Sequence, residues 1–186
     1  MSGGSRPSIA VWDIVVRLGH WSLVTGIAVT WLTIEGPAVL HDGFGYAVLA
    51  ILALRLVWGF AGSRYARFAG FIRSPRATLG YARAVADRRE PRYLGHNPLG
   101  GWMIVALIVS ALGAGISGWL YTTDRFWGVE WVERVHAGFA WAVLGLAALH
   151  VAGVVFTSLR QRENLVAAML HGRKRAPTAD EPAPDA

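Results

Sequence analysis

The sequence predicts an all-α integral membrane protein built as a bundle of four spanning helices. Apolar residues make up 54% of the 186 positions, and the mean hydropathy is +0.38. Charged residues make up only 16%, whereas a soluble domain usually carries about a quarter. A soluble protein with four buried helices is disfavoured, because so short a chain has too little polar sequence to cover them.

Four apolar runs each approach the length of about 20 residues that crosses a bilayer. Lipid offers the backbone no hydrogen-bond partners, so each run must form a helix. Charged residues or glycine and proline bound every run, and small residues inside the runs would let the helices pack closely. The expected spans are residues 18–34, 44–62, 99–121 and 135–159, and the small residues are Gly26, Gly113, Gly115, Gly118, Gly138 and Gly145.

The remaining segments fit one domain over residues 1–175. The first span carries Arg17 and His20 at its entry, and no small-residue cleavage site precedes Glu35, so we interpret it as an uncleaved anchor. Ser74-Pro75 is typical of a helix start, which leaves residues 74–90 as either a short interfacial helix or a solvated basic loop. Residues 176–186 have nothing to bury and are expected to be disordered.

The positions of the basic residues predict the orientation. One face would carry Arg125 and Arg134 only, and the other would carry nearly all the remaining basic residues. By the positive-inside rule both termini are cytoplasmic, so the pI near 10.5 indicates topology and not nucleic-acid binding. The cytoplasmic set comprises Arg6, Arg17, the eight arginines from Arg64 to Arg92, Arg160, Arg162, Arg173, Lys174 and Arg175.

Four histidines fall at two matched depths of the expected bundle. His136 and His150 lie fourteen residues apart in the last span, so they share one helix face at a rise of about 21 Å. His20 matches the cytoplasmic depth of His150, and His41 matches the outer depth of His136. Each pair meets the need of a six-coordinate haem b for one imidazole on either side of the iron. With no cysteine, thiolate sites and covalently attached haem are excluded.

Three arginines are candidates for binding haem propionates. Arg55 follows His41 by fourteen residues, which puts it at the depth of His20 and His150. A buried arginine in a membrane needs an anion, although Arg55 could also extend to the headgroups. Arg17 and Arg134 stand beside His20 and His136, where they could instead be interfacial anchors.

In order along the chain, these residues resemble the bacterial cytochrome b561 family, which includes the cytochrome b subunits of nickel-iron hydrogenases. The likeness covers nearly all of residues 10–175. It is carried by Arg17-Leu18-Gly19-His20-Trp21, His41 with Arg55, Gly62-Ser63-Arg64-Tyr65-Ala66-Arg67-Phe68, Gly95-His96-Asn97-Pro98, His136 with His150, and Arg162-Glu163-Asn164-Leu165.

The resemblance implies a di-haem electron carrier of the bacterial inner membrane. Its expected partners are lipid, membrane quinone or quinol, and a redox protein such as a periplasmic cytochrome c or an oxidoreductase subunit. The alternative is a stand-alone oxidoreductase that passes electrons from superoxide or another small reactant to quinone at the outer haem edge. Trp127 and Trp131 in the outer loop fit either an aromatic belt, which we favour, or a docking site. His96 and His171 are expected to shape or cap local structure rather than bind iron.

Overall fold

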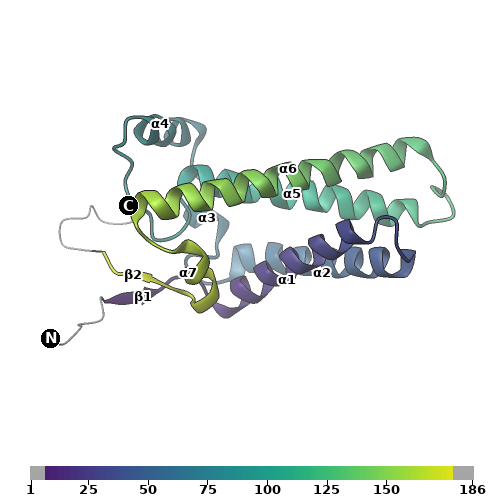
Figure 1. Ribbon diagram of the computed structural model, residues 1–186, viewed down its shortest axis with the longest axis horizontal. Coiled ribbons are helices and arrows are strands. Elements are labelled where there is room, and N and C mark those ends of the chain that lie inside the picture. Colours follow the sequence, from purple (N-terminus) through teal and green to yellow (C-terminus); the bar gives the residue numbers. More distant parts are fainter. Residues whose placement is uncertain (1–6, 178–186) are drawn as a thin grey trace. The chain divides into compact units, whose positions relative to one another are not determined.

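The computed structural model describes residues 7–177 (Figure 1). Arg6 and positions 178–186 of the expected disordered tail lie outside the described residues. At the start of that tail, the backbone N–H of Ala176 donates to the Pro7 carbonyl at 2.9 Å. The tail therefore begins on a residue that is hydrogen-bonded to the first described position.

Four long helices confirm the four expected spans, and each is long and apolar enough to cross a membrane. Three of them begin earlier than the hydropathy predicts: α1 at residue 14 instead of 18, α2 at residue 38 instead of 44, and α6 at residue 130 instead of 135. In the first turn of α6, the carboxylates of Glu130 and Glu133 interact favourably with the helix dipole. The bounds are α1 Ile14–Leu32, α2 Ala38–Ala61, α5 Pro98–Tyr121 and α6 Glu130–Gln161.

Polar side chains set where α1 and α5 begin. The Asp13 carboxylate accepts a hydrogen bond from the Val16 backbone N–H at 2.9 Å, which satisfies a free donor in the first turn of α1. The Asn97 amide oxygen accepts one from the Gly100 N–H at 2.7 Å, and Pro98 occupies the first turn of α5, where no donor is needed. The expectation that the His96-Asn97-Pro98 segment shapes a helix start is thus confirmed for Asn97.

The described residues fall into two compact units, of which the second contains Leu18–Val57 and Ile104–Leu149. Within this unit the parts of α1, α2, α5 and α6 pack as a ring. Trp31 and Trp141 join α1 to α6, with ring centroids 5.0 Å apart. Three glycines make the other contacts, since a Cβ on any of them would come within 2.7 Å of a neighbouring side chain. These glycine contacts are Gly26 with Val48, Gly115 with Leu49, and Gly113 with Phe139.

The long helices leave large apolar side chains on their outer faces. In the most apolar window of α6 only 6% of the positions are buried, and the corresponding share for α2 and α5 is 17%. An apolar surface of this extent on a soluble monomer would be an association site, whereas lipid covers it without cost. Low burial combined with high hydropathy identifies these faces as membrane-facing.

The first unit contains residues up to Arg17, Trp58–Met103 and the chain from His150. Here β1 (Ser8–Ala10) pairs antiparallel with β2 (Arg173–Arg175), as Figure 1 shows. Between the strands in sequence lie α3 (Phe68–Phe71), α4 (Pro75–Ala86) and α7 (Leu165–His171). The Ser74 hydroxyl accepts from the Ala77 N–H at 3.3 Å, which confirms a helix and not a loop at the start of residues 74–90.

Gly172 connects α7 to this small sheet. Its φ of 82° lies in the left-handed region, where a side chain would be strained. Its carbonyl accepts hydrogen bonds from the N–H groups of Val11 and Trp12, at 2.9 and 3.1 Å. Val11 and Trp12 are buried in the core of the unit together with Val16, Ala66 and Ala168.

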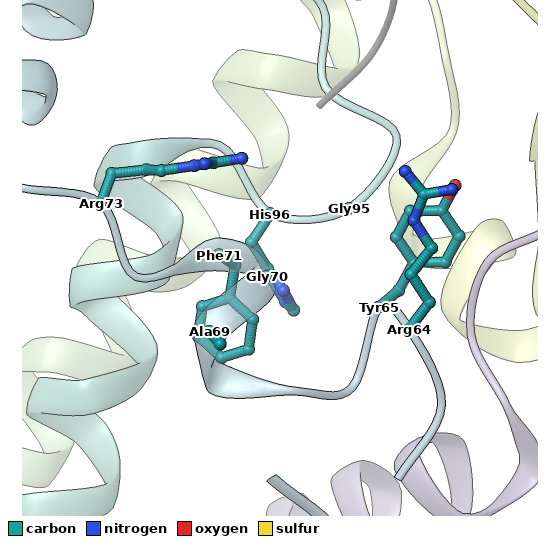
Figure 2. Close-up of a pocket in the computed structure, with 8 residues that line it drawn as sticks. All are labelled: Arg64, Tyr65, Ala69, Gly70, Phe71, Arg73, Gly95 and His96. Atoms are coloured by element: carbon teal, nitrogen blue, oxygen red, sulfur yellow. The ribbon is translucent and has the colours of Figure 1, made fainter. Parts of the chain in front are cut away.

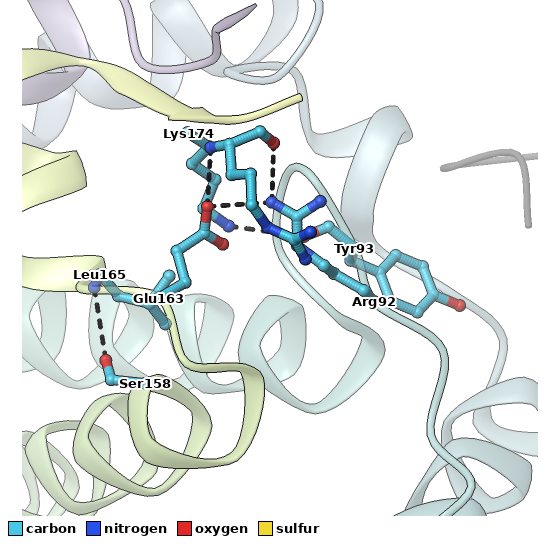
Figure 3. A network of polar contacts seen from close by, with 7 residues as sticks. Arg92, Tyr93, Ser158, Glu163, Leu165 and Lys174 are labelled. Atoms are coloured by element: carbon cyan, nitrogen blue, oxygen red, sulfur yellow. Dashed lines mark hydrogen bonds and ion pairs between the residues drawn. The ribbon is translucent and has the colours of Figure 1, made fainter. Parts of the chain in front are cut away.

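A polar network fastens the C-terminal segment to the loop before α5 (Figure 3). The Glu163 carboxylate pairs with the Arg92 guanidinium at 2.9 Å and accepts from the Arg175 N–H at 2.8 Å. Arg92 also donates to the Arg175 carbonyl at 2.8 Å. Lys174, only 6% exposed, donates to the Tyr93 carbonyl. Each charged group of the network is thus paired or hydrogen-bonded inside the fold, as buried charges require.

Asp13 also crosslinks the first unit. Its carboxylate accepts hydrogen bonds from the Ser63 hydroxyl at 2.5 Å and the Trp58 indole at 3.1 Å. Burial raises the pKa of Asp13, but hydrogen bonds from Ser63, the Val16 and Val15 N–H groups and Trp58 outweigh burial and hold the pKa below its usual value of 3.8. A lowered pKa contributes stability that is present above pH 3.8 and lost as the pH falls through the folded-state pKa.

We therefore expect Asp13→Asn to lower the thermal unfolding midpoint of the protein in detergent. The loss should be about 2 kcal/mol, because a hydrogen-bonded charge is replaced by a neutral amide. The gap between wild type and variant should stay constant from pH 8 to pH 5, where Asp13 remains ionised. Asp87→Asn, at an exposed position after α4, is the matched control. A gap that closes before pH 5 would contradict the lowered pKa.

Candidate functional site

The structure brings the rings of the two outer histidines close together in an edge-on arrangement. His41 lies in the first turns of α2 and His136 in the second turn of α6, both within the second unit. Their ring centroids are 6.1 Å apart, and the ring planes meet at 72°. The sequence predicted this pair from matched depth alone.

Backbone carbonyls fix how the two rings are protonated. Nδ1 of His41 is 2.9 Å from the Thr30 carbonyl oxygen, and Nδ1 of His136 is 2.8 Å from the Ala114 carbonyl oxygen. A carbonyl oxygen can only accept, so in each ring Nδ1 carries the hydrogen. In the neutral ring this tautomer leaves the Nε2 lone pair free, as a histidine that ligates a metal needs.

The ring separation fits one metal ion between the two imidazoles. Two metal–nitrogen bonds of about 2.0 Å, with roughly 1 Å from each nitrogen to its ring centre, place the centres about 6 Å apart. The observed 6.1 Å agrees with this value. Among the described residues no group of three or more histidine, cysteine, aspartate or glutamate side chains could hold a metal ion. The ring separation therefore leaves room for one metal ion bound by two imidazoles.

Glycines shape the space around the rings. A Cβ on Gly118 would stand 3.0 Å from Cε1 and Nδ1 of His136, so α5 can approach the imidazole only because this position lacks a side chain. Gly45 lies one helical turn after His41, and a Cβ there would meet nothing within 4 Å. The half-buried Gly45 thus leaves open space on α2 one turn after His41.

The inner candidates lie in different units and are described separately. In the second unit, His20 on α1 contacts the Trp21 ring edge-on at 5.1 Å, and Arg55 lies on α2 fourteen residues after His41. In the first unit, His150 lies on α6 fourteen residues after His136. His20, Arg55 and His150 are each half-buried, which suits groups that serve an intramembrane site.

The other two arginine candidates have partners within the chain. Arg17 donates to the Leu170 carbonyl near the end of α7, where a cation is favourable for the helix dipole. Arg134 pairs with Glu130 one turn earlier on α6 at 3.1 Å, and both side chains are mostly exposed. An exposed pair of this kind contributes little to stability and leaves the arginine available to other anions.

The remaining aromatic and histidine candidates occupy local positions. Trp127, in the loop before α6, is 72% exposed, and Trp131, in the first turn of α6, is 55% exposed. Either an aromatic belt at the membrane interface or a docking site would require such exposure. The His96 ring lies between Trp12 and Phe71, with centroids 4.6 and 4.9 Å away. His171 ends α7 at an exposed position, and its Nδ1 accepts from the Arg173 N–H just beyond the helix.

Sequence reasoning did not identify the groups that orient the outer pair. Thr30 and Ala114 act through backbone carbonyls, which no residue pattern reveals. Gly118 was predicted only as a small residue for helix packing, and its contact with His136 depends on helix rotation. Asp13 was also missed, although an aspartate just before an apolar run is a usual helix start signal.

Comparison with known proteins identifies the family of the chain. The sequence model of the family described as prokaryotic cytochrome b561 matches residues 11–172. Two similar proteins are both named "Probable Ni/Fe-hydrogenase B-type cytochrome subunit". The one from Bradyrhizobium diazoefficiens is 26% identical and covers 91% of this chain and 87% of its own. The one from Rhizobium leguminosarum bv. viciae is 22% identical, with shares of 91% and 90%. No solved structure matches significantly.

Proposed function

The chain belongs to the prokaryotic cytochrome b561 family and has a membrane haem b electron-transfer role, and from this premise we propose that it is a di-haem conductor between the quinone pool and a redox partner. The single observation that carries the proposal is the outer pair of imidazoles, 6.1 Å apart with both Nδ1 atoms held by carbonyls. Such a pair would hold the iron of a haem b through two imidazoles.

His41 and His136 would hold the outer haem b, which supplies reversible one-electron chemistry when bound. Thr30 and Ala114 accept the Nδ1–H bonds, so the rings keep one tautomer and one orientation. Because the two rings are fixed, they would need little rearrangement when the iron gains or loses an electron. The Trp31 and Trp141 rings pack against each other within the same bundle and join α1 to α6.

For the inner haem we propose His20 and His150 as ligands. The support is helix register, because α6 places His150 four turns after His136, and a bundle with two haems needs its second ligand from another helix. Arg55 would pair with a propionate at that level, since a half-buried guanidinium within a span requires an anion. Arg17 and Arg134 are proposed as secondary propionate contacts.

The partner is proposed to be an oxidoreductase subunit or a periplasmic cytochrome c. The names of the two relatives support the first, because both are named as cytochrome subunits of a hydrogenase. The loop between α5 and α6 would present Trp127 and Trp131 to that partner or to the bilayer surface. We further propose an inner-membrane location with both termini cytoplasmic, on the strength of the arginine distribution.

The test is spectroscopy of the purified full-length protein followed by stopped-flow mixing. We expect low-spin haem b bands, about two haems per chain, and rapid reduction by a quinol. A subsequent mix with a purified cytochrome c should reoxidise the haems. Oxidation of superoxide at a comparable rate, with no electron exchange with any protein, would favour the stand-alone oxidoreductase. A protein without haem bands would overturn the proposal.

A further inference from the structure

A cavity of about 190 Å³ lies in the first unit, between the segment after α2 and the segment before α5. Figure 2 shows Arg73 reaching in from one side, Arg64 and Tyr65 standing at the other, and His96 between them. The lining residues are Arg64, Tyr65, Ala69, Gly70, Phe71, Arg73, Gly95 and His96. The electron-transfer role uses none of them.

Close backbone packing gives this cavity a fixed shape. A Cβ on Gly101 would stand 2.5 Å from the Phe71 carbonyl oxygen, so the first turn of α5 lies directly against α3. The Trp102 indole donates to the Arg73 carbonyl at 3.0 Å, and this ties the base of Arg73 to α5. A Cβ on Gly95 would be 3.2 Å from the Tyr65 ring. The lining therefore comes from two segments, residues 64–73 and 95–96, and the first of them is tied to the start of α5.

The charges on the lining are one-sided. Two guanidinium groups face the cavity, and none of the residues that line it is acidic. Within the described chain, no carboxylate forms an ion pair with Arg64 or Arg73. The Arg64 guanidinium instead lies 5.6 Å from the centre of the Tyr65 ring. By contrast, Arg92 and Arg160 in the same unit each pair with a glutamate. The cavity thus holds uncompensated positive charge.

We propose that this cavity binds a phosphate group, supplied by the headgroup of an anionic phospholipid. Arginine forks match phosphate oxygens in geometry and charge. The cavity adjoins the ends of two spanning helices, since α2 ends at Ala61 and α5 begins at Pro98, which is where lipid headgroups lie. A bound headgroup would neutralise the two arginines and join the α2–α3 segment to the start of α5.

The experiment is a titration of the full-length, haem-loaded protein in detergent with phosphatidylglycerol, followed by native mass spectrometry. Arg64→Gln/Arg73→Gln should weaken binding at least tenfold, because charge-assisted hydrogen bonds are lost. Arg76→Gln/Arg83→Gln is the matched control, since both residues are exposed on α4 and remove the same charge outside the cavity. It should bind as the wild type does.

Two further arms identify the ligand source and guard against misfolding. Phosphatidylcholine and inorganic phosphate are titrated in parallel, and both should bind the wild type at least tenfold more weakly than phosphatidylglycerol. Arg73→Lys keeps the charge but loses the fork, and it should fall between wild type and the double variant. Equal binding by all variants would overturn the site, and equally tight binding of inorganic phosphate would overturn the lipid assignment. Unchanged haem content in the double variant shows that the fold is intact.

Discussion

Replacement of His136 by alanine is expected to remove one haem b per chain and leave the other in place. His136 provides one of the two imidazoles whose ring centroids lie 6.1 Å apart. The remaining proposed ligand, His41, cannot alone hold a low-spin haem. The haem-to-protein ratio should fall from about two to about one. Loss of the Nδ1–H donor also leaves the Ala114 carbonyl without this hydrogen bond.

The measurement is a pyridine haemochrome assay combined with redox titration of the purified variant. One of two reduction steps should disappear, and the other should keep its midpoint. His171→Ala is the control, because that exposed histidine at the end of α7 hydrogen-bonds only locally and its loss should leave the haem content unchanged. Two haems in the His136 variant, with both steps intact, would show that this imidazole is not a ligand.

Hydropathy was sufficient to predict the four spans, because a bilayer constrains helix length more strictly than a soluble core does. It placed the starts of α1, α2 and α6 too late, because Arg17, the His41-Asp42 pair and the Glu133-Arg134 pair interrupt the apolar run after each helix has begun. The pairing of His41 with His136 could also be predicted. Residues at matching ends of antiparallel spans share a depth whatever the rotation of the helices.

Features that depend on how the helices are rotated about their axes, or on backbone conformation and hydrogen bonding, could not be predicted from the sequence. The small sheet consists of three-residue strands, one of which reads Arg-Lys-Arg and carries no apolar alternation. It forms because Gly172 adopts a left-handed conformation and turns the chain back toward Val11 and Trp12. The carbonyl acceptors of the two histidines are likewise invisible in the sequence. Their identity follows only when α1 and α5 are placed against α2 and α6.

The two units differ in how their polar groups are satisfied. In the first unit, side chains such as Asp13 and Glu163 make several hydrogen bonds each and hold loops in place. In the second, the outer imidazoles bond to backbone carbonyls, and glycines set the helix contacts. A substitution that adds volume is therefore expected to harm the second unit most, whereas a substitution that removes charge should harm the first.

Gly118 provides the sharpest test of that difference. A Cβ at this position would lie 3.0 Å from two atoms of the His136 ring, closer than side chains normally approach. Valine adds two further methyl groups, and overpacking of this kind costs about 1–3 kcal/mol. We expect Gly118→Val to push the His136 imidazole away from the Ala114 carbonyl and from His41. The outer haem should then be lost or become high-spin.

Gly118→Ala should produce a graded effect, with the outer haem retained but its midpoint potential shifted and its affinity lowered. Gly153→Val on α6 is the control for added volume in a span, because a Cβ at Gly153 would meet nothing within 4 Å. Haem content, the electron paramagnetic resonance signal of the low-spin iron and the redox titration report the outcome. If Gly118→Val retained both haems with unaltered signals, the position of the His136 ring would not depend on this glycine, and the outer site would need another geometry.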